Sequence, residues 1–132
     1  GTSTGGMFKK RWGRIGDSPV IGAGTYADNN SCAVSCTGHG EYFIRHAVAF
    51  DVCARYKYLK ESVEKAADYI IHTELNTNAG NGGLIAVDKL GNIAMPYNSG
   101  GMFRGFLYKE KGSPEIKKGC GIGKKIVVVG EK

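Results

Sequence analysis

Apolar residues follow a helical spacing in two segments near the middle of the chain. Over residues 41–58 they recur every three or four positions, as expected for the buried face of a helix. Glu41 would lie in the first turn, where the helix dipole favours a negative charge. The same spacing is found over residues 62–75. The pattern therefore predicts two helices, followed by a loop over residues 76–83.

Short apolar runs on both sides of these helices predict strands. Residues 31–36 are small or β-branched and precede the helices. Residues 84–87 and 93–96 flank a Gly-Asn turn, which predicts a β-hairpin. Residues 102–108 predict a further strand, and residues 126–129, bracketed by charged side chains, a last or edge strand. Strands, two helices and then strands indicate an α+β fold.

Length and charge limit the function classes. A chain of 132 residues suits one domain over residues 1–132, and no apolar run approaches the ~18 residues of a membrane span. The net charge of +6 rests on basic clusters at residues 9–14 and 117–125. Since Trp12 is the only aromatic residue within these clusters, we expect solvated loops and no nucleic-acid partner. Residues 119–125 lack the hydroxyl residue of a phosphate-binding loop and are expected to form a turn.

The four cysteines are expected to be free thiols. Cys32 and Cys36 fall four apart on a predicted strand, so they share a face but lie too far apart to bond each other. Cys53 lies in a helical pattern, and Cys120 lies near the end of the chain. Free, mostly buried thiols are typical of a reducing compartment, which predicts a cytoplasmic protein. The alternative is a zinc site from Cys32, Cys36 and His39, but it lacks a fourth ligand.

A turn-rich segment places Arg14 and Asp17 three residues apart. The planar fork of an arginine suits an α-carboxylate, and an aspartate suits the matching ammonium group. Thr-Gly turns at residues 4–5 and 37–38 add hydroxyls and backbone N–H groups, from which an acyl-transfer site can be built. Together they indicate half of a site that hydrolyses an amino-acid amide. The simpler alternative is that Arg14 and Asp17 only pair with each other.

Several segments in this order and spacing resemble the plant-type L-asparaginases, the isoaspartyl peptidase/asparaginases among the N-terminal-nucleophile hydrolases. The segments that carry the resemblance are residues 2–6, 13–19, 22–27, 37–41, 82–88, 91–98 and 100–104. The resemblance runs over residues 1–105, and residues 106–132 form a divergent tail. It implies a four-layer αββα sandwich, of which this chain, as part of the C-terminal (β) subunit, supplies one sheet and one helical layer.

The resemblance also implies roles for individual residues. Thr4 would hydrogen-bond the nucleophile, and Thr37 with Gly38 would stabilise the oxyanion. Arg14 and Asp17 would hold the α-carboxylate and α-amine of an aspartyl group. His39 is expected to be a loop residue near the substrate and not a general base. The residues placed at the substrate site are Arg14, Ile15, Gly16, Asp17, Thr37, Gly38, His39 and Gly40. No metal or organic cofactor is expected.

One departure from the family pattern concerns the nucleophile, which in the family is the N-terminal threonine of the C-terminal subunit, freed by self-cleavage. This sequence begins at Gly1, within the strand that follows that threonine. We therefore expect that the nucleophile lies outside this chain and that the chain alone is inactive. The expected partners are the α subunit, a second αβ protomer and a small-molecule substrate.

The resemblance favours hydrolysis of L-asparagine and β-aspartyl dipeptides through an acyl-enzyme. Two alternatives stay open. One is glycosylasparaginase, which shares Arg14, Asp17 and the Thr37-Gly38 pair but lacks the segments at residues 82–88 and 95–98. The other is a non-catalytic fragment that only packs against a partner subunit.

Overall fold

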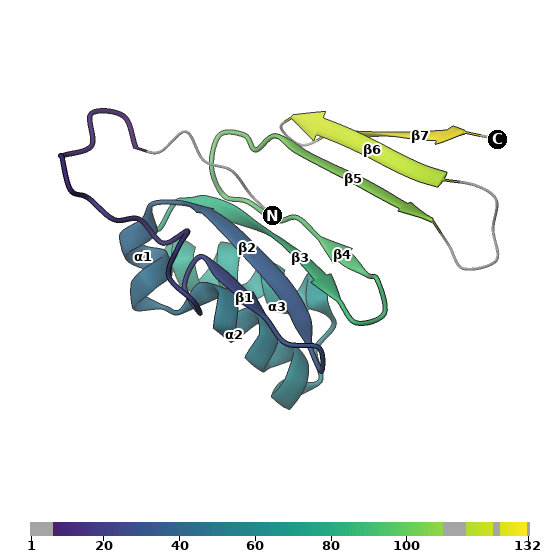
Figure 1. Ribbon diagram of the computed structural model, residues 1–132, viewed down its shortest axis with the longest axis horizontal. Helices are drawn as coiled ribbons and strands as arrows, with labels where there is room; N and C mark the ends of the chain where they lie inside the picture. The colour runs from purple at the N-terminus through teal and green to yellow at the C-terminus, as the bar shows by residue number, and fades with distance from the viewer. Residues whose placement is uncertain (1–6, 110–115, 123–124, 132) are drawn as a thin grey trace. The chain divides into compact units, whose positions relative to one another are not determined.

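The chain divides into two compact units, Gly1–Asn98 and Ser99–Lys132. That residues 1–132 form one domain stays a prediction. The computed structural model describes residues 7–109, 116–122 and 125–131 (Figure 1). The first unit contains the predicted substrate segment and the helices, and the elements described in the second unit are all strands. The predicted mixed α+β class is confirmed.

A four-stranded antiparallel sheet forms the centre of the first unit. Its order is β1-β2-β3-β4. The strands are β1 (Thr25–Ala27), β2 (Cys32–Gly38), β3 (Gly82–Asp88) and β4 (Ile93–Ala94). The chain between β2 and β3 forms the helices, which cover one face of the sheet (Figure 1). The predicted hairpin is confirmed, since β3 and β4 pair around a turn closed by Asp88 and Asn92.

The predicted helix over residues 41–58 is interrupted at Ala47. Helix α1 (Gly40–Arg45) ends two residues before Ala47. Helix α2 (Val48–Ala54) begins directly after Ala47 and continues into the wider π-helical turns of η1 (Arg55–Leu59). Ala47 has a φ of 46°, in the left-handed region, so the chain changes direction at this residue. The prediction of one continuous helix is therefore wrong, although apolar residues on both sides of the break are buried.

The second predicted helix, over residues 62–75, is confirmed. Helix α3 (Val63–Tyr69) runs directly into η2 (Ile70–Leu75), whose turns are again π-helical. The Ser62 side chain accepts a hydrogen bond from Lys65 N at 3.2 Å, which caps the first turn. Helical backbone continues to Thr77, two residues into the predicted loop.

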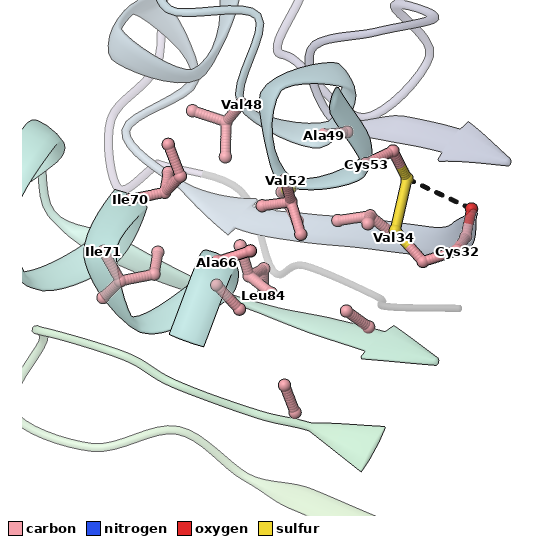
Figure 2. Packing of buried hydrophobic residues seen from close by; sticks show 14 of the residues in the cluster. Cys32, Val34, Val48, Ala49, Val52, Cys53, Ala66, Ile70, Ile71 and Leu84 are labelled. Carbon is pink, nitrogen blue, oxygen red and sulfur yellow. Dashed lines mark hydrogen bonds between the residues drawn. A yellow bond between two sulfur atoms is a disulfide. The ribbon is translucent and has the colours of Figure 1, made fainter. Parts of the chain in front are cut away.

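Apolar side chains of the sheet and helices form one core (Figure 2). Strands β2 and β3 alternate buried and more exposed residues, so one face of each packs against the helices. The buried set includes Val34, Cys36, Phe43, Val48, Val52, Val63, Ala66, Ile70, Ile71, Leu75, Leu84 and Ala86. The sheet is thereby fixed to the helices along its length.

A disulfide joins Cys32 of β2 to Cys53 of α2 within this core (Figure 2). The two Cα atoms are 5.5 Å apart, the usual separation for a disulfide. The prediction of free thiols is therefore wrong for these two residues, because α2 packs its cysteine onto the strand. The zinc alternative is also wrong, since Cys32 is bonded to Cys53. Cys36 is a buried thiol, whereas Cys120 is exposed and not mostly buried as predicted.

The second unit is a three-stranded antiparallel sheet in the order β5-β6-β7. Its strands are β5 (Arg104–Lys109), β6 (Ile116–Ile122) and β7 (Lys125–Glu131). Two of these are the predicted strands at 102–108 and 126–129. The predicted turn over residues 119–125 is wrong for residues 119–122, which pair on both sides as part of β6, and residues 123–124 lie outside the described residues. No helix among the described residues is long and apolar enough to cross a membrane.

Candidate active site

The predicted substrate segment meets the start of helix α1. Asp17 is buried, with 4 % of its surface exposed. A β-carbon at Gly40 would lie 2.9 Å from both the backbone N and the Oδ1 of Asp17, so only a glycine fits there without displacement. Gly16 is also in contact, with its Cα 3.3 Å from the same point. The structure thus brings together Gly16, Asp17 and Gly40, which the sequence placed at one site.

The Asp17 carboxyl group has an unsatisfied atom. Its buried Oδ2 has no hydrogen-bond partner among the described residues. Burial is the main cause that raises the pKa of Asp17, and the nearby Glu41 carboxylate raises it further. A hydrogen bond from the backbone and the charge of Arg14 act in the opposite direction. A buried carboxylate with an open acceptor is suited to bind an ammonium group.

Arg14 forms its ion pair with Glu41 at the start of α1. Its Nη2 donates to Glu41 Oε2 at 2.7 Å, and this hydrogen bond lowers the pKa of Glu41. The Arg14 side chain is 22 % exposed and that of Glu41 45 %. The structure therefore does not support the simpler alternative, in which Arg14 pairs only with Asp17. The sequence pattern predicts for Glu41 only a stabilising role at the start of a helix. Its contact with Arg14 joins residues that are 27 apart in sequence, so no local pattern reveals it.

Thr37 and Gly38 end strand β2 and lead directly into this corner. Thr37 pairs with Gly83 and Gly38 with Gly82. The backbones approach closely, since a β-carbon at Gly82 would lie 2.8 Å from Gly38 Cα and 2.8 Å from the Phe43 ring. Beyond the strand, His39 N donates to Asn81 O at 2.8 Å. The strand end is therefore held on both sides of Gly38.

The remaining predicted residues differ in their placement. His39 is exposed, and its ring lies 6.4 Å from that of Tyr42, centroid to centroid. Ile15 is 72 % exposed beside Arg14. Thr4 lies outside the described residues. The site residues that the structure brings into contact are thus those of the 14–17 segment and the start of α1.

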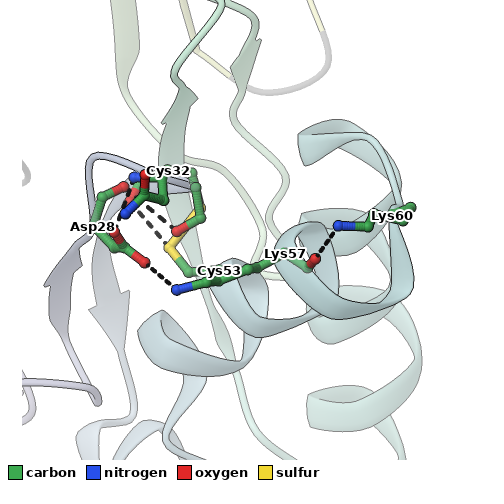
Figure 3. Close-up of polar contacts among 7 residues, drawn as sticks. Asp28, Cys32, Cys53, Lys57 and Lys60 are labelled. Atoms are coloured by element: carbon green, nitrogen blue, oxygen red, sulfur yellow. Dashed lines mark hydrogen bonds and ion pairs between the residues drawn. A yellow bond between two sulfur atoms is a disulfide. The ribbon is translucent and has the colours of Figure 1, made fainter.

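A second polar cluster lies at the other end of strand β2. Lys57 Nζ donates to Asp28 Oδ2 at 2.9 Å, next to the Cys32–Cys53 bond (Figure 3). Asp28 is also held through a backbone hydrogen bond to Cys32 O at 3.1 Å. Its pKa is lowered, first by the Asn30 backbone N–H and then by Lys57. The polar groups of this cluster have their hydrogen-bond partners within the fold, so the cluster stabilises the strand end.

No group of three or more His, Cys, Asp or Glu side chains that could hold a metal ion occurs among the described residues. The Arg14–Asp17 corner offers charged groups and hydrogen-bond donors. It can bind a positive and a negative group side by side. This pairing fits the zwitterionic end of an amino acid.

Comparison with known proteins identifies the group to which the chain belongs. A family model described as asparaginase matches residues 1–116. The isoaspartyl peptidase of Salmonella typhimurium is 52 % identical over 107 residues, which is 81 % of this chain and 34 % of that protein. The Escherichia coli isoaspartyl peptidase is 47 % identical over 121 residues, covering 84 % of this chain and 38 % of that protein.

A plant relative is equally similar. The probable isoaspartyl peptidase/L-asparaginase 2 of Arabidopsis thaliana is 52 % identical over 105 residues, which is 80 % of this chain and 31 % of that protein. The chain thus spans about a third of the length of the relatives it matches. The family match covers the whole segment from Arg14 to Glu41 that forms the corner. On this match, the chain belongs to the asparaginase family.

Proposed function

We propose that the protein containing this chain hydrolyses the side-chain amide of L-asparagine and the isopeptide bond of β-aspartyl dipeptides. The observation that carries the proposal is the buried Asp17 carboxyl group, whose Oδ2 has no hydrogen-bond partner among the described residues. An α-ammonium group bound at Asp17 would supply the missing donor. Substrates of both kinds carry such a group next to an α-carboxylate.

Arg14 would bind the α-carboxylate. Glu41 engages only Nη2 of the guanidinium group, and a substrate carboxylate would use the remaining donors of the fork. Glu41 would thereby fix the orientation of Arg14 while Asp17 binds the amine. With the two charged ends held, the side-chain carbonyl of the substrate would extend toward the end of strand β2.

The reaction proposed at that point follows the family resemblance. The hydroxyl of an N-terminal threonine, supplied from outside this chain, attacks the side-chain carbonyl carbon, and its own α-amine takes the proton. The Thr37 hydroxyl and the Gly38 N–H stabilise the resulting oxyanion, a contribution of typically ~3 kcal/mol per donor. The α-amine returns this proton to the leaving nitrogen as ammonia or an amino acid departs, and water then hydrolyses the acyl-enzyme ester. Thr4 would hydrogen-bond the nucleophile.

We further propose that the chain works together with an α subunit and a second αβ protomer. In this assembly the chain would supply one sheet and one helical layer of an αββα sandwich. The support is that the chain spans about a third of the length of its relatives. A cytoplasmic location stays a prediction. The Cys32–Cys53 bond is unusual in a reducing compartment, so alkylation of the protein in fresh cell extracts would test the location.

The function is tested by assaying the full-length enzyme on three substrates: asparagine, a β-aspartyl dipeptide and a glycosylated asparagine. We expect turnover of the first two. Turnover of the glycosylated substrate alone would identify a glycosylasparaginase, and no turnover of any would indicate a non-catalytic protein. The 132-residue chain assayed by itself should release no ammonia from asparagine above the uncatalysed rate.

A further inference from the structure

The side chain of Asn98 joins three backbone segments around the start of strand β3. Its Oδ1 accepts a hydrogen bond from Gly82 N at 2.8 Å. Its Nδ2 donates to Gly80 O at 2.8 Å and to Ile71 O at 3.2 Å. The side chain thus connects η2, the loop that follows it and β3. The amide uses both its donor and its acceptor groups at this point.

Asn98 also extends the sheet beyond β4. Leu84 N donates to Pro96 O at 3.1 Å, and Asn98 N donates to Gly82 O at 2.9 Å. The Asn98 side-chain oxygen then accepts from Gly82 N, the bond that a strand carbonyl would otherwise provide. Gly80 and Gly82 are buried, so loss of these bonds would leave polar backbone groups without partners.

The segment that Asn98 holds is the one that holds Gly38. Asn81, between the two glycines bound by Asn98, accepts the hydrogen bond of His39 N at 2.8 Å. Gly82 lies directly opposite Gly38, close enough that a β-carbon on Gly82 would lie 2.8 Å from Gly38 Cα. A shift of residues 80–82 therefore cannot be absorbed without moving residues 37–39.

We propose that Asn98 is a positioning residue for the Thr37–Gly38 element, acting through residues 80–82. The proposal deepens the proposed function and rests on it, because it gives Asn98 a role in placing the oxyanion donors. A residue that only stabilised the fold would affect the free energy of unfolding and leave the geometry at Gly38 unchanged. Asn98 should affect both.

The test uses three variants of the full-length enzyme. Asn98→Ala removes all three side-chain bonds. Asn98→Asp keeps the acceptor for Gly82 N but turns a second oxygen toward two carbonyl groups. The control is Asn92→Ala, which removes a hydrogen bond of 2.8 Å from Asn92 Nδ2 to Asp88 Oδ2 at the opposite end of strand β3. Control and test variants both lose an asparagine hydrogen bond next to the same strand.

We expect both Asn98 variants to lower kcat for asparagine about tenfold or more, with KM changed about twofold or less, since transition-state stabilisation would be lost. Asn92→Ala should lower Tm without changing kcat. For Asn98→Asp the loss of kcat relative to wild type should shrink at low pH, where the protonated carboxyl group can donate a hydrogen bond. This rescue would not occur if the position mattered only for folding.

Hydrogen exchange of the His39 amide gives a readout that needs no activity. It should be faster in both Asn98 variants than in the wild type, and unchanged in Asn92→Ala. If Asn98→Ala does not fold, Asn98→Asp carries the test. Unchanged kcat and unchanged His39 exchange, with only Tm lowered, would overturn the proposal. A wild-type enzyme inactive on every substrate would refute the proposed function, and the exchange result would still decide the positioning role.

Discussion

Asp17 is a carboxylate in a place that disfavours charge. Burial raises its pKa, so the folded protein takes up this proton at a higher pH than the unfolded chain. Ionised Asp17 therefore lowers stability at neutral pH, and stability is regained as the pH falls through the raised pKa toward the ordinary value of 3.8. The ammonium group of a substrate would remove the same cost by pairing with the carboxylate. Asp17, the residue proposed to bind substrate, therefore lowers the stability of the unbound protein at neutral pH.

Asp17→Asn in the full-length enzyme should separate these two roles. We expect a higher Tm than the wild type at neutral pH, because the buried charge is gone. The difference should diminish as the pH approaches 3.8, where wild-type Asp17 is also neutral. At the same time kcat/KM for asparagine should fall at least about tenfold, through loss of the ammonium contact. Thermal melts across pH and steady-state kinetics measure both.

Asp28→Asn is the matched control, with the opposite sign. The pKa of Asp28 is lowered by the Asn30 backbone N–H and by Lys57, so its charge stabilises the fold above pH 3.8. This variant should lower Tm at neutral pH and leave kcat/KM unchanged. A lower Tm in Asp17→Asn as well would mean that the charge of Asp17 is compensated within the fold.

Arg14 should not tolerate replacement by lysine. Arg14→Lys keeps the charge but loses the fork, which in the proposed site serves Glu41 and the substrate carboxylate together. We expect kcat/KM for asparagine to fall about tenfold or more, an effect of ~1.4 kcal/mol. Arg11→Lys, at an exposed position in the same segment, is the control and should have no effect. Equal activity of Arg14→Lys and wild type would disprove the carboxylate contact.

At the scale of elements, the break between α1 and α2 requires a left-handed backbone conformation at Ala47, which alanine adopts only at a cost in free energy. Ala47 has a φ of 46°, and a left-handed conformation costs an L-residue roughly 1–2 kcal/mol. Ala47→Gly should therefore stabilise the protein by about 1 kcal/mol after the entropy of the added flexibility is subtracted. Ala54→Gly, within the continuous helix formed by α2 and η1, should destabilise it by about 1 kcal/mol. Urea denaturation of both variants measures the two signs.

The elements that could be predicted from sequence are those whose own residues determine them. The helix over residues 62–75 has a capping serine and an uninterrupted apolar face, and the hairpin after Gly82 has its turn residues in place. Strand β1 was not predicted, because three residues carry no period and the strand exists through its pairing with β2. The break at Ala47 left no signal, since the apolar spacing is helical on both sides of it.

The same distinction holds for the site. Arg14, Asp17 and Gly40 could be proposed from motif order, and the structure brings Asp17 and Gly40 into contact. Contacts between distant elements could not be proposed: Arg14 with Glu41, Cys32 with Cys53, and Asn98 with three backbone segments. Each depends on how the helices pack on the sheet, which a single sequence does not specify.

At the scale of the whole molecule, the first unit exposes apolar side chains that a partner would cover. On strand β3 the face away from the helices carries Ile85, which is half-buried, and Val87, which is 43 % exposed. Four further large apolar residues between residues 8 and 21 are more than 70 % exposed: Phe8, Trp12, Ile15 and Ile21. We expect these exposed apolar side chains to mark surfaces that bind another protein.

The 132-residue chain by itself should accordingly self-associate at about 0.15 M salt, where the repulsion from its charge of +6 is screened beyond ~8 Å. Sedimentation velocity measures the association. Replacing Ile85 and Val87 with threonine should reduce it, whereas Leu90→Ser, at the exposed hairpin turn, should not. A monodisperse monomer that melts cooperatively would show that these surfaces need no partner.

The burial of Cys36 has a practical consequence for labelling the protein. Desolvation and the neighbouring Asp17 charge raise the pKa of the Cys36 thiol far above neutrality, so little reactive thiolate forms. Cys32 and Cys53 are bonded to each other, and Cys120 is an exposed thiol on strand β6. A maleimide dye added to the folded, unreduced protein should therefore attach at Cys120 and report on the second unit alone.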